Sequence, residues 1–179
     1  MQVVTLRLAS SDENFAARFA EVERGCLTVL ERSYPTYYGD DYQLRRIVED
    51  RCTLYLAMHG DLVVGVSYVK ENLRRGGTAV YPDQYRRRGI AESLTRASLQ
   101  DFPQQYTILS IRNEKMIALM RKVGFRFARS VQEIKMIVKS EFEILGDFSV
   151  SDDKVIFRRQ SLKRGVERDD LTLLHTFAI

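Results

Sequence analysis

The residues best suited to chemistry lie between Thr78 and Glu92, where a short apolar segment, a turn and three consecutive arginines precede a helical pattern. The turn contains Pro82 and Asp83, and Gly89 follows the arginines. Backbone N–H groups at the start of a helix have no partner within that helix, and the helix dipole adds partial positive charge there. Glycine lets a bulky ligand approach the backbone, and arginine suits phosphate oxygens. These residues therefore predict a phosphate or pyrophosphate site at a helix N-terminus.

The same residues carry a family resemblance. Arg86-x-x-Gly89-x-Ala91 resembles the Gln/Arg-x-x-Gly-x-Gly/Ala motif of the GNAT superfamily of N-acetyltransferases, and Asn113 with the later Gly124-Phe125 is similar to that family's Asn…Gly-Phe signature. The resemblance extends over about residues 3–139 and implies an α/β fold with a mixed sheet that binds acyl-CoA. It predicts a GNAT domain over 1–139 and a β-rich C-terminal extension over 140–179, packed on the core or on a partner subunit as in a homodimer.

The resemblance also implies where acetyl-CoA would bind. The strand residues that match the backbone grip on the pantetheine arm and the thioester carbonyl are Thr78, Ala79 and Val80. The residues that match the pyrophosphate-binding loop are Arg86, Arg87, Arg88, Gly89, Ile90, Ala91 and Glu92, and Asn113 is the further cofactor-binding residue expected. The arginine side chains have two open interpretations, contact with phosphate or adenine and plain solvated surface.

The proton-transfer groups depart from the family pattern. Many GNAT enzymes carry a tyrosine four residues before the glycine of Gly-Phe, as the general acid for the leaving thiolate, and here that position is Met120. Some protein N-terminal acetyltransferases carry a glutamate five residues before the asparagine, and here that position is Ile108. Neither side chain can move a proton, which argues against the ribosomal N-terminal acetyltransferase subgroup.

The remaining candidates for proton transfer are few. Glu71 follows a predicted strand and is the candidate general base, directly or through water, with a surface carboxylate as the alternative. Tyr81 is the candidate hydroxyl donor, and Tyr85 and Ser110 are further hydroxyls nearby, with packing as the alternative for the rings. The tyrosine-rich segment 34–42 matches the family's acceptor-lining region in position, and aromatic walls with hydroxyl tips suit an amine or a peptide.

The composition indicates one soluble globular domain. The chain has 179 residues, of which 45% are hydrophobic and 29% charged, as is ordinary for such domains. Cys26 and Cys52 are interpreted as buried thiols rather than as a disulfide or a nucleophile. Two histidines without clustered ligands predict no metal site. The absence of a long apolar run and of a signal pattern predicts a cytoplasmic protein that does not contact a membrane.

Hydrophobic periodicity predicts the remaining elements. Strands are expected over residues 3–8, 54–58, 62–69, 106–111, 125–130 and 134–138, with another ending at residue 80. Helices are expected over residues 15–26, 90–97 and 116–123. In the extension, residues 148–150 and 155–157 predict a hairpin. The apolar residues 171–179 are expected to pack on the core or to meet a partner.

Three functions stay open on these grounds. The first is an N-acetyltransferase that moves an acetyl group from acetyl-CoA to a primary amine, on a small molecule or a peptide, by direct attack on the thioester. The second is a non-catalytic acyl-CoA-binding regulatory module, which Met120 favours. The third is nucleic-acid binding through the arginine cluster. The modest net charge of +4 and the acidic residues spread along the chain argue against this third function.

Overall fold

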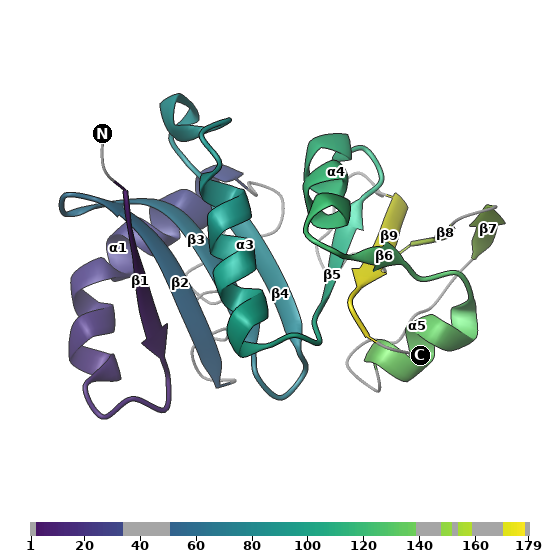
Figure 1. Cartoon of the computed structure of the whole chain (residues 1–179), viewed down its shortest axis with the longest axis horizontal. Helices are drawn as coiled ribbons and strands as arrows, with labels where there is room; N and C mark the ends of the chain where they lie inside the picture. The colour runs from purple at the N-terminus through teal and green to yellow at the C-terminus, as the bar shows by residue number, and fades with distance from the viewer. Residues whose placement is uncertain (1–2, 34–50, 139–147, 152–153, 159–169, 178–179) are drawn as a thin grey trace, which may run out of the picture. The chain divides into compact units, whose positions relative to one another are not determined.

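The computed structural model describes residues 3–33, 51–138, 148–151, 154–158 and 170–177 (Figure 1). The chain forms two compact units, Met1–Pro103 and Gln104–Ile179, and each unit contains both strands and helices. The tyrosine-rich segment 34–42 and the predicted domain boundary between residues 139 and 140 lie outside the described residues, so both stay predictions.

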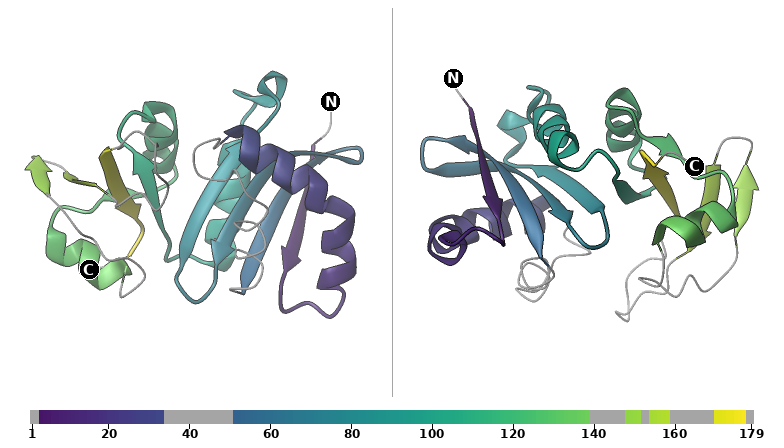
Figure 2. Two further views of the ribbon diagram at one scale, coloured as in Figure 1. Left: turned by 180° about the vertical axis from the view of Figure 1, so that it is seen from behind. Right: turned by 60° about the horizontal axis from the view of Figure 1, so that its bottom comes forward.

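The N-terminal unit is an antiparallel sheet with a helix on each face (Figures 1 and 2). Neighbouring strands of the sheet are, in order, β1 (Val4–Ala9), β2 (Cys52–His59), β3 (Leu62–Lys70) and β4 (Arg75–Val80). The helix α1 (Phe15–Ser33) covers one face, and α3 (Ile90–Asp101) covers the other. The hairpin predicted around the turn between β2 and β3 is confirmed by the pairing of His59 with Leu62.

Alternation along the strands separates the two faces of this sheet. On β2, Leu54 and Leu56 pack with α1, whereas Tyr55 and Ala57 pack in the cluster that contains the start of α3. This follows from the period of two that a strand imposes on its side chains. Gly65 on β3 has a special role, because a Cβ atom there would lie 2.9 Å from Cγ2 of Ile90 and 3.0 Å from Cδ1 of Leu94. The first turns of α3 can therefore approach the sheet closely only because this residue is glycine.

The C-terminal unit is likewise built on antiparallel strands. Its strands are, in order, β5 (Tyr106–Ser110), β9 (Asp170–His175), β8 (Lys154–Arg158) and β7 (Ser149–Ser151), and the short β6 (Arg126–Phe127) also pairs with β9. The helices of the unit are α4 (Glu114–Lys122) and α5 (Val131–Val138). The predicted hairpin is confirmed as β7 and β8. The apolar C-terminal segment pairs within the chain itself, where Leu173 and Leu174 are completely buried.

The strand predicted over residues 134–138 is wrong, because these residues belong to α5. Ser130 Oγ accepts a hydrogen bond from the backbone N–H of Glu133 at 3.0 Å, and the Glu133 carboxylate accepts one from the N–H of Arg129 at 2.6 Å. Ser130 is thus an N-cap of α5, and the Glu133 carboxylate satisfies the N–H group of the residue before the cap, a variant of the capping-box pattern. Ile134, Ile137 and Val138 then lie on one buried face at helical spacing.

The predicted α/β fold is confirmed. Most neighbouring strands of its sheet are antiparallel. The strand predicted over residues 125–130 is present but shorter, since only Arg126 and Phe127 pair with β9. None of the helices in the described parts of the chain has the length and apolarity that crossing a bilayer requires.

Candidate functional site

The start of α3 offers bare backbone amides. Gly89 occupies the position before the first helical residue with φ 77°, in the left-handed region that favours glycine, and no side chain in the described part of the chain caps the helix there. Gly89 is exposed, and a Cβ atom on it would meet open space. By their position in the first turn, the N–H groups of Ile90 and Ala91 have no acceptor within the helix. Together with the helix dipole, they form a place where an anion can bind.

The turn before this helix is fastened to the end of β4. It runs from Val80 through the 3₁₀ turn η1 (Asp83–Tyr85). Arg86 donates from Nε to the carbonyl oxygen of Val80 at 3.2 Å, and its Nη1 lies 2.9 Å from Oδ1 of Asp83. The Arg86 guanidinium therefore holds the turn closed, so the leading residue of the motif has a structural role.

Tyr85, one of the candidate hydroxyl donors, is also held inside the turn. Its ring is buried, and its hydroxyl group lies 2.8 Å from Nδ1 of His59 at the end of β2. The two rings are tilted against one another with centroids 5.6 Å apart. The structure thus gives Tyr85 a role in fixing the turn against the β2–β3 hairpin.

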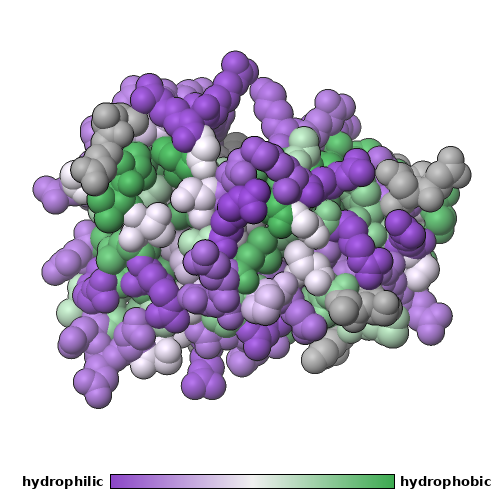
Figure 3. All heavy atoms as spheres, viewed as in Figure 1, coloured by the Kyte–Doolittle hydropathy of each residue, from purple (hydrophilic) through white to green (hydrophobic). Residues whose placement is uncertain are grey.

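The surface over η1 is hydrophilic (Figure 3). Arg87 and Arg88 are exposed, and Arg87 adopts φ 60°, which turns the chain toward Gly89. Glu92, in the first turn of α3, would repel an anion, but Nη2 of Arg96 lies 3.1 Å from its carboxylate. Such a solvent-exposed pair contributes little to stability, yet it lowers the negative charge beside the helix start.

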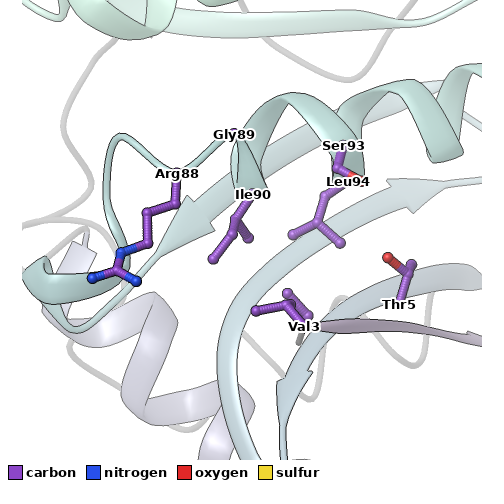
Figure 4. Close-up of a pocket in the computed structure, with 8 residues that line it drawn as sticks. Val3, Thr5, Arg88, Gly89, Ile90, Ser93 and Leu94 are labelled. Carbon is purple, nitrogen blue, oxygen red and sulfur yellow. The ribbon is translucent and has the colours of Figure 1, made fainter. Parts of the chain in front are cut away.

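A cavity of about 280 Å³ adjoins the first turns of α3 on the side of β1 (Figure 4). Its lining combines apolar and polar residues from α3 and the turn before it, from β2, and from β1 with the residue that precedes it: Val3, Thr5, Ala57, Arg88, Gly89, Ile90, Ser93 and Leu94. Val3, Ile90 and Leu94 point toward one another, whereas Arg88 points away from them along the turn. The cavity is part of the surroundings of the bare amides rather than a separate site.

The strand residues expected to hold a cofactor lead directly into this turn. Thr78, Ala79 and Val80 form the end of β4 and pair with Ser67, Val66 and Gly65 of β3. Thr78 and Ala79 are buried, and Val80 is half-buried. The structure therefore joins the predicted strand positions to the predicted loop positions in one continuous strand–turn–helix segment.

The two predicted proton-transfer residues lie far apart. Glu71 follows the last residue of β3, and Tyr81 follows the last residue of β4, so they stand at opposite ends of the antiparallel ladder. Tyr81 lies beside Val64, and seven residue steps from Val64 to Glu71 span roughly 24 Å. Glu71 Oε1 accepts a hydrogen bond from Oγ1 of Thr53 at 2.8 Å, and the Tyr81 N–H donates to the carbonyl of Val64 at 3.1 Å. They cannot both contact one reacting centre.

The predicted residues of the C-terminal unit have local structural partners. Asn113 Oδ1 accepts a hydrogen bond from the N–H of Met116 at 3.3 Å and so caps α4. Ser110 Oγ accepts from the N–H of Arg112 at 3.2 Å. Met120 is buried in α4 with an exposed fraction of 3%. A role of Asn113 in cofactor binding stays a prediction, as do the roles of the residues around Gly89.

Both cysteines are buried, as predicted. Burial raises the pKa of the Cys26 thiol to about 12, so this thiol stays protonated near neutral pH. A protonated, enclosed thiol cannot act as a nucleophile.

No family model and no curated protein matches the sequence. Among solved structures, the ribosomal-protein-S18-alanine N-acetyltransferase of Escherichia coli is similar, with 13% identity, a TM-score of 0.63 and coverage of 99% of this chain and 97% of that one. Arabidopsis thaliana NAA60 in complex with a bisubstrate analogue has 15% identity and a TM-score of 0.62, with 97% of each chain covered. A GNAT family acetyltransferase from Elizabethkingia anophelis with acetyl-CoA bound has 11% identity and a TM-score of 0.55, with 98% of each chain covered.

The chain has the GNAT fold. The resemblance read from Arg86-x-x-Gly89-x-Ala91 is thereby confirmed for the fold. At these identities the likeness concerns architecture, and the chemistry has to be argued from this chain's own residues.

Several polar residues around this strand–turn–helix segment could not be recognised from the sequence. Ser67 and Thr95 are buried hydroxyls that bond to Thr78, and His59 bonds to Tyr85. A polar residue within an otherwise apolar strand, as Ser67 is in β3, was the available signal, because buried polar groups need partners. The partners themselves could not be named, since they come from distant parts of the chain.

Proposed function

We propose that this protein is an acyl-CoA-dependent N-acyltransferase that transfers an acetyl group from acetyl-CoA to a primary amine on a small molecule or a peptide. The observation that carries the proposal is the uncapped start of α3 at Gly89, continuous with β4, in a GNAT fold. The acetyl-CoA bound to the Elizabethkingia protein and the bisubstrate analogue bound to NAA60 support the same ligand class for this architecture.

The residues around α3 would bind and orient the donor. The N–H groups from Gly89 to Glu92 would bind the pyrophosphate, where charge-assisted hydrogen bonds are the strongest available. The backbone of Thr78 to Val80 would align the pantetheine arm. Holding the thioester and the amine in one geometry supplies a large part of the barrier reduction.

The reaction itself is a direct transfer. The lone pair of a neutral amine attacks the thioester carbonyl carbon, the new C–N bond forms and the C–S bond breaks. The amine loses a proton and the CoA thiolate gains one, so the products are an amide and CoA with a free thiol. Glu71 as the base and Tyr81 as the acid are proposals of this scheme, and their separation along the ladder means that at most one of them acts directly on the reacting groups.

The test is to mix the protein with acetyl-CoA and a panel of amines and peptides, and to follow the free thiol. We expect thiol release that requires the amine, with the acetylated product identified by mass spectrometry. Binding of CoA without thiol release for any member of a broad panel would contradict the enzymatic assignment.

The second candidate function is a non-catalytic acyl-CoA-binding module. Met120 favours it, because a buried thioether stands where many members of the superfamily carry a tyrosine that protonates the thiolate. This candidate predicts CoA binding with no turnover, so the thiol assay and a CoA titration together separate the two functions.

A further inference from the structure

Three buried hydroxyl groups connect β3, β4 and α3. Ser67 Oγ lies 2.9 Å from Oγ1 of Thr78, and Thr78 Oγ1 lies 3.2 Å from Oγ1 of Thr95. Thr95 Oγ1 then donates to the carbonyl oxygen of Ala91 at 2.8 Å. The exposed fractions of Ser67, Thr78 and Thr95 are 2%, 4% and 2%. The hydroxyl chain formed by these residues therefore lies between the sheet and the first turns of the helix, where hydrogen bonds are strengthened by the low local dielectric.

The hydroxyl chain has a direction, because each hydroxyl group has only one proton to donate. The Ala91 carbonyl can only accept, so the proton of Thr95 points to it. The Thr95 oxygen must then accept from Thr78, and the Thr78 oxygen accepts from Ser67. The order of donation is Ser67 to Thr78 to Thr95 to Ala91. The single proton of Thr78 is thus directed toward the helix rather than toward a ligand.

We propose that the Thr78–Thr95–Ala91 part of the hydroxyl chain is a positioning device for CoA, with Thr95 as its key residue. It fixes the first turn of α3, at Ala91, against β4 at Thr78. This inference rests on the proposed function, in which the helix start holds the pyrophosphate and β4 aligns the thioester arm. A ligand that reaches both places needs a fixed offset between them, whereas a fragment that reaches only one place does not.

The close contact at Gly65 supports this role. On the same side of α3, Ile90 and Leu94 pack against Gly65 so closely that no Cβ atom fits. Packing therefore limits how near the helix lies to the sheet, while the bonds from Thr78 through Thr95 limit its displacement over β4. Dispersion contacts are non-directional, and hydrogen bonds add the direction.

The experiment compares three probes in binding titrations: CoA, inorganic pyrophosphate and S-acetylpantetheine. In Thr95→Val we expect the Kd for CoA to rise about threefold to tenfold, the range that one net hydrogen bond gives. The Kd values for pyrophosphate and S-acetylpantetheine are expected to stay within twofold of wild type. Thr95→Ser keeps the hydroxyl and is expected to restore CoA binding.

Thr172→Val in the C-terminal unit is the matched control. Thr172 is completely buried, and its hydroxyl donates to the Val155 carbonyl at 3.1 Å, so the variant loses a buried hydrogen bond of the same kind elsewhere. We expect it to lower the thermal midpoint as Thr95→Val does, with an unchanged Kd for CoA. Should Thr95→Val fail to fold, Thr95→Ala carries the same comparison without a new methyl group beside the carbonyl.

The outcomes separate the inference from the proposed function. A wild-type protein that does not bind CoA overturns the proposed function and the inference together. Wild-type binding with an equal affinity in folded Thr95→Val overturns the inference alone. An equal loss for CoA and for both fragments also overturns it, because that result indicates general damage. Ser67 lies outside the connection from Thr78 through Thr95 to Ala91, so Ser67→Ala leaves both bonds of Thr95 in place and CoA affinity is expected to persist. A loss as large as that of Thr95→Val would overturn the assignment of the positioning role to Thr95.

Discussion

The two ends of α3 differ. At the N-terminal end the helix begins after the exposed Gly89, and no side chain among the described residues caps its first N–H groups, whereas at the C-terminal end Asp101 is hydrogen-bonded to two side chains of the sheet. Asp101 Oδ2 accepts a hydrogen bond from the Tyr55 hydroxyl at 2.7 Å and another from Nε of Arg7 at 2.8 Å. A carboxylate at a helix C-terminus is unfavourable against the dipole, so these partners offset that cost. One end of the helix is thus open to a ligand, and the other is anchored.

The titration behaviour of the anchored end reflects these bonds. The hydrogen bond from Tyr55, and then that from Arg7, lower the pKa of Asp101. Burial, and then the hydrogen bond to Asp101, raise the pKa of Tyr55. Both groups stay in their bonded forms near neutral pH, a negative Asp101 and a protonated Tyr55. The bonds of Asp101 stabilise the C-terminal end of α3, whereas the start of α3, which no side chain of the described ranges caps, is the end at which we propose that the ligand binds.

The largest effect is expected from Gly89→Glu, which places a side chain and a negative charge at the open end. The Kd for CoA should rise about 100-fold or more, since charge-assisted hydrogen bonds of roughly 1.5–3 kcal/mol each are lost. Gly60→Glu is the matched control, because Gly60 also has a positive φ and open space around it but lies in the β2–β3 turn. Calorimetry should show loss of CoA binding only in the first variant. Equal affinities in two folded variants would remove the pyrophosphate assignment.

The next effect concerns which end carries out proton transfer. Glu71 lies toward the anchored end through its bond to Thr53, and Tyr81 lies at the open end. Glu71→Gln keeps an oxygen for Thr53, and Tyr81→Phe keeps the ring, so both variants should fold. We expect one of them, and not both, to lower turnover at neutral pH by about 100-fold, as removal of a general acid or base typically does. If the pH–rate profiles of both variants superimpose on that of the wild type, neither residue transfers the proton, and the amine is deprotonated without a side chain acting as base.

The smallest effect is expected from Asp101→Asn at the anchored end. The free energy of unfolding at pH 7 should fall by about 1 kcal/mol, a value reduced for the partial exposure of the carboxylate. Because the folded-state pKa of Asp101 is lowered, its stabilisation is present above the unfolded pKa of about 4 and is lost as the pH falls through the folded value. Denaturant curves for wild type and variant should therefore converge in acid, while the Kd for CoA stays within twofold. A difference in the free energy of unfolding that stays constant across pH, or a parallel loss of CoA affinity, would contradict the separate roles assigned to the two ends of α3.

Local sequence patterns were enough to predict much of this molecule. The strand before the turn, the helix after Gly89 and the hairpin at Gly60 follow from periodicity and from turn residues that act over a few positions. The segment 134–138 was misread because its apolar run also fits a strand, although Ser130 and Glu133 were present as a helix start signal.

The partners across the fold could not be predicted in this way. The bonds from Thr78 to Thr95 and from Tyr55 to Asp101 join residues on different elements. They depend on which helix face meets which strand, and that is settled by packing rather than by local spacing. The separation of Glu71 from Tyr81 likewise became visible only with the register of β3 and β4.

The most direct test of the central claim is to titrate CoA into ¹⁵N-labelled protein and follow the backbone amide signals at the two ends of α3. We expect the largest shifts at Gly89, Ile90 and Ala91, with no change at Asp101 and Phe102. Saturable CoA binding that leaves the signals of Gly89 to Ala91 in place, or that moves those of Asp101 and Phe102 instead, would contradict it.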